Sequence, residues 1–417
     1  MTHAFDSRRR NVSRPVGRSP AVGAALTVVA ALLAVAAQGA AAQQYVEYIA
    51  LNIERQPPRV LPQPEDFASI TAGDNHTCVT RVNGNTYCWG ANNSGQVGMA
   101  STATCSGVPC VDRPRFVMTA KTVEAGSDHS CALDANGKAF CWGNSNYGQL
   151  GNGNYGYMAQ PIAVSGGHTF TSISAGQFST CGTTAGGMYC WGAIVNALSG
   201  APTPSQVFAW SGYQTVSVGY LHACALDVIG SWRAVDCWGN NPNGQAGIDP
   251  LQFPIVPPTL RSSFGTAVAR VSAQTGHTCV DQLNGTVQCA GYNGWGQLGN
   301  GGYAPTHQPQ TVGSGMALHG VSSSGNHNCA LDSTNRAYCW GNGYWGQLGN
   351  GASDVYPQPQ PVAGGRTFRA IATGHRHTCA IGTDNNIYCW GNNHYGQLGT
   401  QYPGGWVWSP VQTLTPI

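Results

Sequence analysis

The chain has 417 residues, of which only 9% are charged, and it contains 57 glycines and 16 cysteines. Its formal net charge is +2, but five of the 19 Lys and Arg residues and one of the 17 Asp and Glu residues lie before residue 43. The remainder is close to −2, with Lys121 and Lys138 as its only lysines. Nucleic-acid binding requires a basic surface that displaces counterions, so this balance argues against a nucleic-acid partner.

The first 42 residues predict an export signal. Five arginines within residues 8–18 precede an apolar run from Ala21 to Ala37, and Ala40-Ala41-Ala42 follows before Gln43. This order is typical of a secretory signal peptide. An uncleaved anchor is the alternative, because the 17-residue run reaches the lower limit for a membrane span. We expect cleavage, no stable membrane insertion afterwards, and a protein that is secreted, periplasmic or on the cell surface.

After residues 43–64, expected to be a linker or a closing strand, residues 65–417 repeat with a period near fifty. The first cysteines of successive pairs are 43 to 55 residues apart. Such a period predicts one repeat array rather than separate domains. The seven pairs are Cys78 with Cys88, Cys131 with Cys141, Cys181 with Cys190, Cys224 with Cys237, Cys279 with Cys289, Cys329 with Cys339, and Cys379 with Cys389.

Each repeat reads as β-structure. In the sixth repeat, His327-Asn328-Cys329-Ala330-Leu331 and Ala337-Tyr338-Cys339-Trp340-Gly341 are short alternating runs, and Gly, Asn and Pro separate such runs throughout. No window of useful length has a helical period. The sequence therefore predicts an all-β chain built from hairpins.

Hairpin geometry predicts a disulfide in every repeat. In the second repeat, a three-residue loop with Gly137 in the left-handed position places Cys131 directly opposite Cys141. Facing residues of this kind are close enough for a disulfide. Zinc is the competing interpretation, but the spacing is not the C-x2-4-C of structural zinc sites. Cys105 and Cys110, in an insertion at residues 101–112, complete an even count of cysteines that favours an oxidising compartment.

Two further features concern the core and the closure of the array. A tryptophan follows the second cysteine in six repeats, and this periodic position predicts a buried core between repeats; the residues are Trp89, Trp142, Trp191, Trp238, Trp340 and Trp390. The fifth repeat has Ala290 there. At the C-terminus, Ser409-Pro410-Val411 matches the start of a further repeat, so a C-terminal strand could complete the first repeat and close a ring. Val60 is the rival for that place.

The recurring G-x-x-H, Trp-Gly and Gly-Gln-x-Gly motifs closely resemble the repeats of the regulator of chromosome condensation family. Six of seven repeats carry each motif, and the resemblance covers essentially residues 65–417. It implies a seven-bladed β-propeller. The founding member is a nucleotide-exchange factor whose surface uses acidic and His side chains of the G-x-x-H segments. The matching positions here are Asp74, His76, Asp128, His129, His222, His277, His327 and His377.

The resemblance does not carry the activity with it. An exported protein would not meet a small GTPase, so exchange activity is not expected. A plant photoreceptor of this fold uses Gly-Trp-Arg-His-Thr motifs, but His375 replaces the tryptophan in Gly374-His375-Arg376-His377-Thr378, which argues against photoreception. A secreted bacterial relative uses its propeller face to block an enzyme, which suits the predicted compartment better.

Segments that interrupt the repeat are candidate binding regions, because loops carry function on a rigid scaffold. They are the insertion at 101–112, Ala193 to Pro204 in place of a Gly-Gln-x-Gly, the Pro-rich Ile248 to Pro258, and the C-terminal Tyr402, Trp406 and Trp408. Aromatic residues also precede four Gly-Gln-x-Gly motifs and suit recognition hot spots, although they could pack on their own turns. The partner-binding candidates are Asp74, His76, Asp128, His129, His277, His327, His375, His377, Tyr147, Trp295, Trp345, Tyr395, Trp406 and Trp408.

These observations favour an exported, monomeric, non-catalytic propeller that binds or scaffolds a protein or glycan partner. An inhibitor of an extracytoplasmic enzyme is one alternative. An enzyme is the other, and it would need acid and base groups clustered at one mouth of the channel. No cofactor is expected. A shared metal is not expected either, because blade symmetry would keep the repeated histidines too far apart to ligate one ion.

Overall fold

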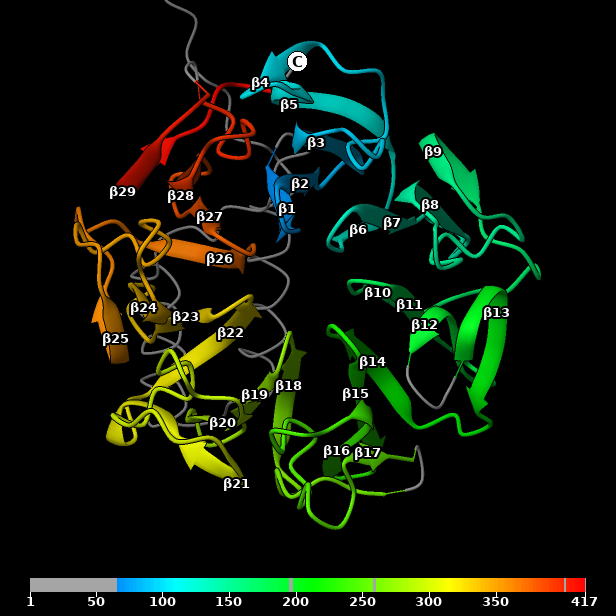
Figure 1. The fold of residues 1–417 in the computed structure, drawn as a ribbon, viewed down its shortest axis with the longest axis vertical. Coiled ribbons are helices and arrows are strands. Elements are labelled where there is room, and N and C mark those ends of the chain that lie inside the picture. The colour runs from blue at the N-terminus through cyan, green and yellow to red at the C-terminus, as the bar shows by residue number, and fades with distance from the viewer. Residues whose placement is uncertain (1–65, 195–197, 258–259, 401–402, 417) are drawn as a thin grey trace, which may run out of the picture. The chain divides into compact units, whose positions relative to one another are not determined.

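The predicted repeat array forms a ring of seven antiparallel sheets around a channel (Figure 1). A computed structural model describes residues 66–194, 198–257, 260–400 and 403–416, all of which belong to the propeller. Six sheets have four strands and the first has five. The expected all-β, seven-bladed propeller is confirmed. The expected signal peptide, the segment at 43–64 and Tyr402 lie outside the described residues.

Each blade uses its strands in chain order from the channel outward. The first strands are β1 (Phe67–Ala72), β6 (Thr122–Ala125), β10 (Ser172–Ala175), β14 (Tyr213–Val218), β18 (Val268–Ala273), β22 (Leu318–Ser324) and β26 (Phe368–Thr373). The second strands are β2 (His76–Arg81), β7 (His129–Leu133), β11 (Ser179–Thr184), β15 (His222–Ile229), β19 (His277–Gln282), β23 (His327–Asp332) and β27 (His377–Gly382).

The third strands are β3 (Asn85–Ala91), β8 (Ala139–Asn144), β12 (Gly187–Ile194), β16 (Trp232–Asn240), β20 (Val287–Gly291), β24 (Ala337–Asn342) and β28 (Ile387–Asn392). The outer strands are β5 (Val108–Thr119), β9 (Tyr157–Ala163), β13 (Leu198–Phe208), β17 (Ile255–Val256), β21 (Thr306–Thr311), β25 (Val355–Pro361) and β29 (Trp406–Gln412). The short β4 (Ala103–Cys105) pairs with β5, and a single 3-10 turn, η1 (Val312–Ser314), follows β21. The part of the chain that the structure describes contains no helix with the length and apolar character needed to span a bilayer.

The cysteines pair as the hairpin geometry predicts, with one bridge between the second and third strands of every blade. The Cα atoms of the bridged residues are 4.0 to 4.1 Å apart in all seven blades. The bridges join Cys78 to Cys88, Cys131 to Cys141, Cys181 to Cys190, Cys224 to Cys237, Cys279 to Cys289, Cys329 to Cys339, and Cys379 to Cys389. The predicted disulfide register is therefore confirmed in each repeat.

Two local predictions about the hairpins, the conformation of Gly137 and the pairing of Cys105 with Cys110, are also confirmed. Gly137 has the left-handed conformation expected of its loop, with φ of 77°. Cys105 and Cys110 form the eighth disulfide, so all 16 cysteines are paired. Eight disulfides indicate folding in an oxidising environment.

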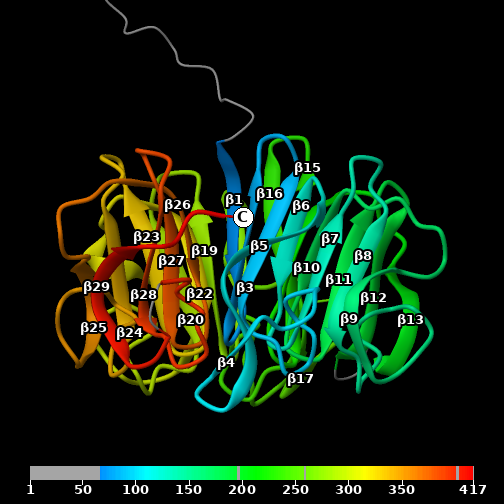
Figure 2. The same ribbon diagram turned by 90° about the horizontal axis from the view of Figure 1, so that it is seen from above.

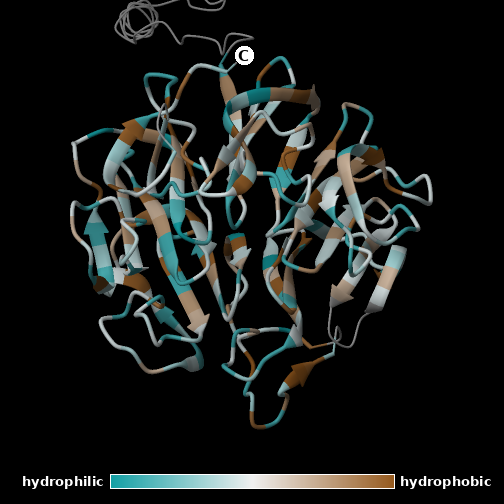
Figure 3. Ribbon diagram, turned by 45° about the horizontal axis from the view of Figure 1, so that its top comes forward, coloured by the Kyte–Doolittle hydropathy of each residue, from teal (hydrophilic) through white to brown (hydrophobic). Residues whose placement is uncertain are grey.

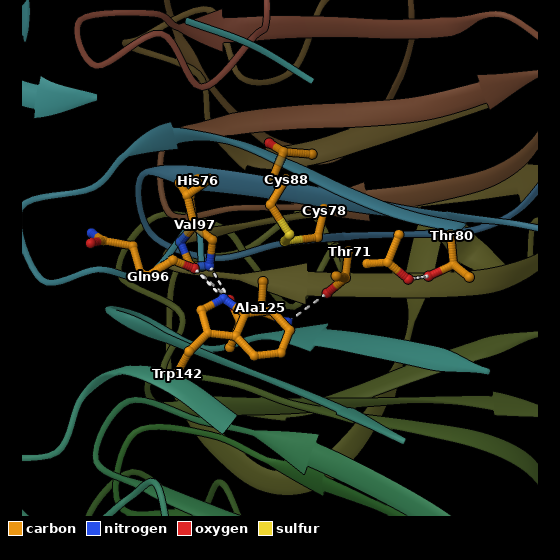
Figure 4. Close-up of a disulfide and its surroundings, with 12 residues drawn as sticks. Thr71, His76, Cys78, Thr80, Cys88, Gln96, Val97, Ala125 and Trp142 are labelled. Carbon is orange, nitrogen blue, oxygen red and sulfur yellow. Dashed lines mark hydrogen bonds between the residues drawn. A yellow bond between two sulfur atoms is a disulfide. The ribbon is translucent and has the colours of Figure 1, made fainter. Parts of the chain in front are cut away.

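Apolar packing connects the blades, and its residues are spread over all seven sheets rather than gathered in one (Figure 3). The six predicted core tryptophans are at most 1% exposed. Trp142, for example, lies in one cluster with Cys78 and Val97 of the preceding blade. Figure 4 shows this indole next to the blade 1 disulfide. The prediction that these tryptophans form the core between blades is confirmed.

The ring does not close in the way the sequence suggests. The C-terminal strand β29 pairs with β28 of its own blade, with Tyr388 opposite Gln412, and blade 1 has its own outer strand β5. The Pro-containing segment therefore ends each repeat instead of beginning the next. Blades 1 and 7 are joined side by side: β1 packs on β26 and β27, and the Phe67 amide donates to Asn385 Oδ1 at 3.0 Å. Val60 lies outside the described residues.

Strand direction gives the propeller two different faces (Figure 2). Because neighbouring strands are antiparallel, the turns between first and second strands lie at the same end as the loops between third and outer strands. We call this end the motif face, since it carries the G-x-x-H and Gly-Gln-x-Gly segments. The opposite end, with the hairpins between second and third strands, is the hairpin face.

Candidate functional site

The glutamine side chain of each Gly-Gln-x-Gly motif holds its own turn on the motif face. In five of the six motifs the glutamine carbonyl oxygen also accepts hydrogen bonds from the next blade. In blade 6, Gln347 Oε1 accepts the Trp345 backbone N–H at 2.8 Å, which holds the turn that presents Trp345. The Gln347 carbonyl oxygen accepts the Trp390 indole N–H at 2.9 Å and the Thr378 hydroxyl at 2.8 Å from blade 7. The motif is therefore structural, and the aromatic residue that precedes it is the part left for recognition.

The repeated histidines belong to the same network and are not exposed. Each side chain is at most 1% exposed, and its Nε2 hydrogen-bonds a side chain of the next blade rather than its own. The bonds, 2.8 to 2.9 Å long, join His76 to Ser130, His129 to Thr180, His222 to Thr278, His277 to Asn328, His327 to Thr378 and His377 to Thr77.

The protonation of these histidines follows from their partners. Asn328 Oδ1 only accepts, so His277 Nε2 carries the proton and donates, while Asn328 Nδ2 donates to the Gln297 carbonyl oxygen at 2.7 Å. Burial lowers the pKa of His277 to about 4 and of the other five to about 3. Neutral, buried histidines cannot contact a partner, so we remove His76, His129, His277, His327 and His377 from the binding candidates.

The glycine of G-x-x-H is explained by the narrow approach of neighbouring blades at the channel mouth. A methyl group added at Gly73 would lie 2.1 Å from the Gly126 carbonyl oxygen, and one at Gly126 would lie 2.3 Å from that of Gly176. Only glycine permits this contact. The glycine of this motif is therefore required by the packing of neighbouring blades and does not indicate a common binding or catalytic role.

Aromatic side chains gather on the motif face of blades 5 to 7. Trp345 and Trp406 have ring centroids 5.6 Å apart, Trp406 and Trp408 are 6.3 Å apart, and the Arg376 guanidinium lies 4.7 Å above the Trp345 ring. Trp295 contacts Tyr344 edge to face at 5.8 Å. Trp406 is 47% exposed and Tyr344 48%. We call Trp295, Tyr344, Trp345, Arg376, Trp406 and Trp408 the aromatic surface.

Two other aromatic candidates lie outside the aromatic surface. Tyr147 is 45% exposed and packs on Phe178 of the next blade, which in turn contacts Tyr220. Tyr395 is half-buried in blade 7. Tyr147, Trp295 and Trp345, each of which precedes a Gly-Gln-x-Gly motif, thus contact rings of the next blade. Sequence reasoning missed Arg376, Phe178 and Tyr220, although each occupies a variable position of a G-x-x-H segment where such a side chain stands out.

Three polar candidates meet at the channel mouth. Asp74 and His375 line a cavity of about 160 Å³, with His375 Nδ1 3.8 Å from Asp74 Oδ1. Burial raises the pKa of Asp74, and burial together with the charge of Asp74 raises the pKa of Asp128 to about 6. Both Ser127 and His375 interact with Asp74, so the group does not form a Ser-His-Asp relay. Among the described residues, no three His, Cys, Asp or Glu side chains gather as metal ligands would.

The predicted stapled loop is exposed at its tip but is also attached to blade 7. β4 and β5 extend the first sheet, and the hairpin tip, Ser106, donates its hydroxyl to the His394 carbonyl oxygen at 2.9 Å. A methyl group added at Gly396 would lie 3.3 Å from Cys105 Sγ. His394 in turn contacts Trp406, with ring centroids 5.7 Å apart. The insertion therefore bridges the junction where the ring closes, next to the aromatic surface.

Comparison with known sequences gives matches along the repeats. Two sequence models, both described as the Regulator of chromosome condensation (RCC1) repeat, match the chain. One matches residues 67–96, 120–149, 214–245, 319–347 and 368–397, and the other matches 83–133, 136–182 and 335–381. Together they cover more than half of the chain. The stretches between the matches contain the third repeat's missing Gly-Gln-x-Gly and the fifth repeat's Ala290.

Curated relatives match over parts of their length. The chain is 28% identical to the Ultraviolet-B receptor UVR8 of Arabidopsis thaliana over 213 residues, which are 48% of this chain and 47% of the receptor. It is 33% identical to the human X-linked retinitis pigmentosa GTPase regulator over 102 residues, which are 24% of this chain and 10% of that protein. The chain thus spans about half the length of the plant relative and much less of the human one.

Solved structures share the fold. Prp20p from Saccharomyces cerevisiae, described with its binding properties to Gsp1p and histones, superposes with a TM-score of 0.69 at 18% identity, covering 84% of this chain and 88% of Prp20p. Human WBSCR16 also gives 0.69 at 17% identity, covering 79% of this chain and 93% of that one. At these identities the likeness concerns the fold alone.

Proposed function

Because the chain belongs to the regulator of chromosome condensation repeat family, we propose that it is an exported, monomeric, non-catalytic binding module that engages a protein partner through its aromatic surface. The observation that carries this proposal is the grouping of four tryptophans, a tyrosine and an arginine beside one another on one face. Trp, Tyr and Arg are the residues most enriched at the energetic centres of protein interfaces.

Two further observations support a binding role outside the reducing cytosol. The eight disulfides suit an extracytoplasmic compartment, and the expected signal at residues 1–42 agrees with export. Prp20p, which shares the fold, is described as binding the proteins Gsp1p and histones. Arg376 gives the surface a positive charge beside its rings, so a partner segment with apolar and acidic side chains would complement it.

The test is capture from the extracytoplasmic fraction of the native host with the disulfide-intact propeller. The test variant combines Trp345→Ala and Trp406→Ala, neither of which lies in the blade core. Trp232→Ala is the matched control, because Trp232 is 55% exposed and stands on the hairpin face. We expect one protein to be retained by the wild type and the control and lost from the double variant.

Four outcomes would contradict the proposal or replace part of it. Equal retention by the double variant would remove the aromatic surface, and retention that survives proteolysis of the fraction but not deglycosylation would assign the surface to a glycan. A chain that stays in the cytosol when it is expressed with its native N-terminus would contradict export. A captured hydrolase that loses activity on binding would make the module an inhibitor.

A further inference from the structure

The wall of the central channel contains a repeated hydrogen bond between blades. In five blades, a Ser or Thr on the first strand accepts the backbone N–H of the next blade's first strand at 2.9 to 3.2 Å. These pairs are Thr71 with Ala125, Ser174 with Val218, Ser217 with Ala273, Ser272 with Ser323, and Ser322 with Thr373. Figure 4 draws the first of them. The equivalent residues of the other two blades are Glu124 and Ala372.

Glu124 places an ionisable carboxyl group in the channel wall, at a position where five other blades have a serine or threonine. Among the described residues its carboxyl group forms no hydrogen bond or ion pair, although Glu124 lines the channel cavity. Burial raises its pKa to about 7, and the nearby positive charge of Arg270 limits the rise. The Glu124 carboxyl therefore does not make the hydrogen bond between first strands that a hydroxyl makes in five other blades.

Arg270 faces the same cavity from β18. Glu124 and Arg270 are the only charged residues among those that line this space of about 340 Å³, and no ion pair joins them. Asp281 is the other carboxylate near Arg270, but its oxygens accept the backbone N–H groups of Gly320 and Val321 at 2.8 and 3.1 Å. The channel therefore holds one negative and one positive group, each open to a ligand.

The surrounding wall suits a small polar molecule. The lining combines Ser and Thr hydroxyls with short apolar side chains, and Ala72, Ala125 and Gln274 also line the mouth cavity on the motif face. The two cavities therefore share part of their wall and lie next to each other along the channel. A space of a few hundred cubic ångströms is at the lower end of ligand-pocket volumes.

We propose that the channel binds a small zwitterion, such as a free amino acid, with the ligand's ammonium group at Glu124 and its carboxylate at Arg270. A guanidinium group binds a carboxylate through two parallel hydrogen bonds, and a carboxylate accepts from an ammonium group. One ligand that carries both charges satisfies both side chains while the hydroxyl lining hydrogen-bonds its polar atoms. This site is separate from the aromatic surface and does not rest on the proposed function.

The test uses ω-amino acids as rulers, because their two charges are separated by chains of increasing length. Glycine, β-alanine, γ-aminobutyrate and ε-aminocaproate are titrated into the full chain by calorimetry, with butyrate and butylamine as probes that carry only one charge. We expect at least one zwitterion to bind about tenfold or more tightly than either single-charge probe.

Two variants and a control locate the site. Glu124→Ser restores the hydroxyl that four other blades have as serine, so the variant should fold, with an unchanged or higher melting temperature, and lose at least about tenfold in affinity. Arg270→Gln should lose a similar factor. Trp232→Ala changes an exposed residue of the hairpin face that does not line the cavity, and its affinity should equal that of the wild type.

The proposal is overturned if the folded wild type binds none of the four zwitterions. It is also overturned if butyrate or butylamine binds as tightly as the best zwitterion, or if folded Glu124→Ser retains full affinity. None of these results depends on partner capture by the aromatic surface, so failure here is distinguishable from failure of the proposed function.

Discussion

The junction between blades 6 and 7 and the junction between blades 3 and 4 solve the same packing problem with different chemistry. At the first, the Gln347 carbonyl oxygen accepts from the Trp390 indole and from the Thr378 hydroxyl, and His327 hydrogen-bonds the same hydroxyl. At the second, the third repeat has no Gly-Gln-x-Gly, Ser179 stands at the histidine position and Ala223 at the hydroxyl position.

At the junction of blades 3 and 4, the missing Gly-Gln-x-Gly, histidine and hydroxyl leave two buried polar groups without hydrogen bonds. The Ser179 hydroxyl and the Trp238 indole N–H are buried there without hydrogen-bond partners among the described residues. Apolar contacts replace the network: Phe208 lies 5.0 Å from Tyr213 and 5.2 Å from Trp238, measured between ring centroids. The comparison shows that the three motifs form one hydrogen-bonded unit across two blades: where the Gly-Gln-x-Gly and the histidine are both absent, the retained Trp238 indole has no hydrogen-bond partner among the described residues.

The largest expected difference between the two junctions comes from matched tryptophan substitutions. Trp390→Phe removes a buried hydrogen bond and leaves a small cavity, and we expect the free energy of unfolding to fall by about 2–3 kcal/mol. Trp238→Phe removes an N–H that has no partner among the described residues, so only the cavity counts and the free energy of unfolding should fall by about 1 kcal/mol. Urea unfolding followed by circular dichroism measures both, and equal losses would refute the comparison.

The closing junction between blades 7 and 1 should depend on the bridging insertion. Replacing Cys105 and Cys110 together with alanine removes a short-loop disulfide, for which the chain-entropy estimate is about 2 kcal/mol. Because Ser106 contacts His394, amide hydrogen exchange should accelerate in residues 392–400 of blade 7. The double substitution of Cys329 and Cys339 is the control, and it should leave exchange in that loop unchanged. A protected loop in the first variant would show that the insertion does not hold the junction.

Lowering the pH should destabilise a junction that contains a buried histidine, such as the one between blades 2 and 3, but not the junction of blades 3 and 4 in the same way. His129 has a pKa of about 3 in the folded protein against 6.5 as its ordinary value, so the unfolded chain binds the proton first as the pH falls. Its contribution to stability is complete above pH ~6.5 and is lost by about 1.4 kcal/mol per pH unit between pH ~6.5 and pH ~3.

His129→Gln should therefore be less stable than the wild type by about 1–2 kcal/mol at neutral pH and should approach it near pH ~5. Ser179→Ala, at the corresponding position of blade 3, should show a difference from the wild type that does not change with pH. Unfolding midpoints across this range measure both differences, and a constant deficit for His129→Gln would contradict the buried, neutral histidine.

The smallest expected effect is a gain. Ala223→Ser places a hydroxyl opposite the unpartnered Ser179 and restores part of the motif network at the junction of blades 3 and 4. We expect stabilisation of up to about 1 kcal/mol, measured by thermal unfolding. Ser179→Ala combined with Ala223→Ser removes the new partner again, so the gain should disappear in the double variant.

The features of the fold that could be predicted from the sequence depend on contacts within one repeat or on the repeat period. Cys131 faces Cys141 because a short hairpin loop determines which residues oppose each other, and the same holds for every cysteine pair within a blade. The tryptophans after the second cysteines are buried because a periodic apolar position must meet its neighbour in each repeat. The closing strand was misassigned because repeated sequence marks a period without marking where each structural unit begins.

The burial of the histidines and the assembly of the aromatic surface could not be predicted from the sequence, because both depend on contacts between blades. The histidines were surface candidates because the family resemblance places such side chains on a binding face. Each is instead buried against a hydroxyl or amide about 50 residues away or, for His377, 300 residues away. Trp345, Arg376 and Trp406 are far enough apart in sequence that no local pattern brings them together.

Spacing and strand geometry within one repeat predicted the disulfide register and the all-β class, and the count of seven repeats predicted the number of blades. Only the tertiary structure decided which polar residues face solvent, how blades 7 and 1 meet, and that Glu124 and Arg270 line one channel. The physical reason is that these properties depend on which side chains lie across the junction from one another, and each junction joins residues of two different repeats.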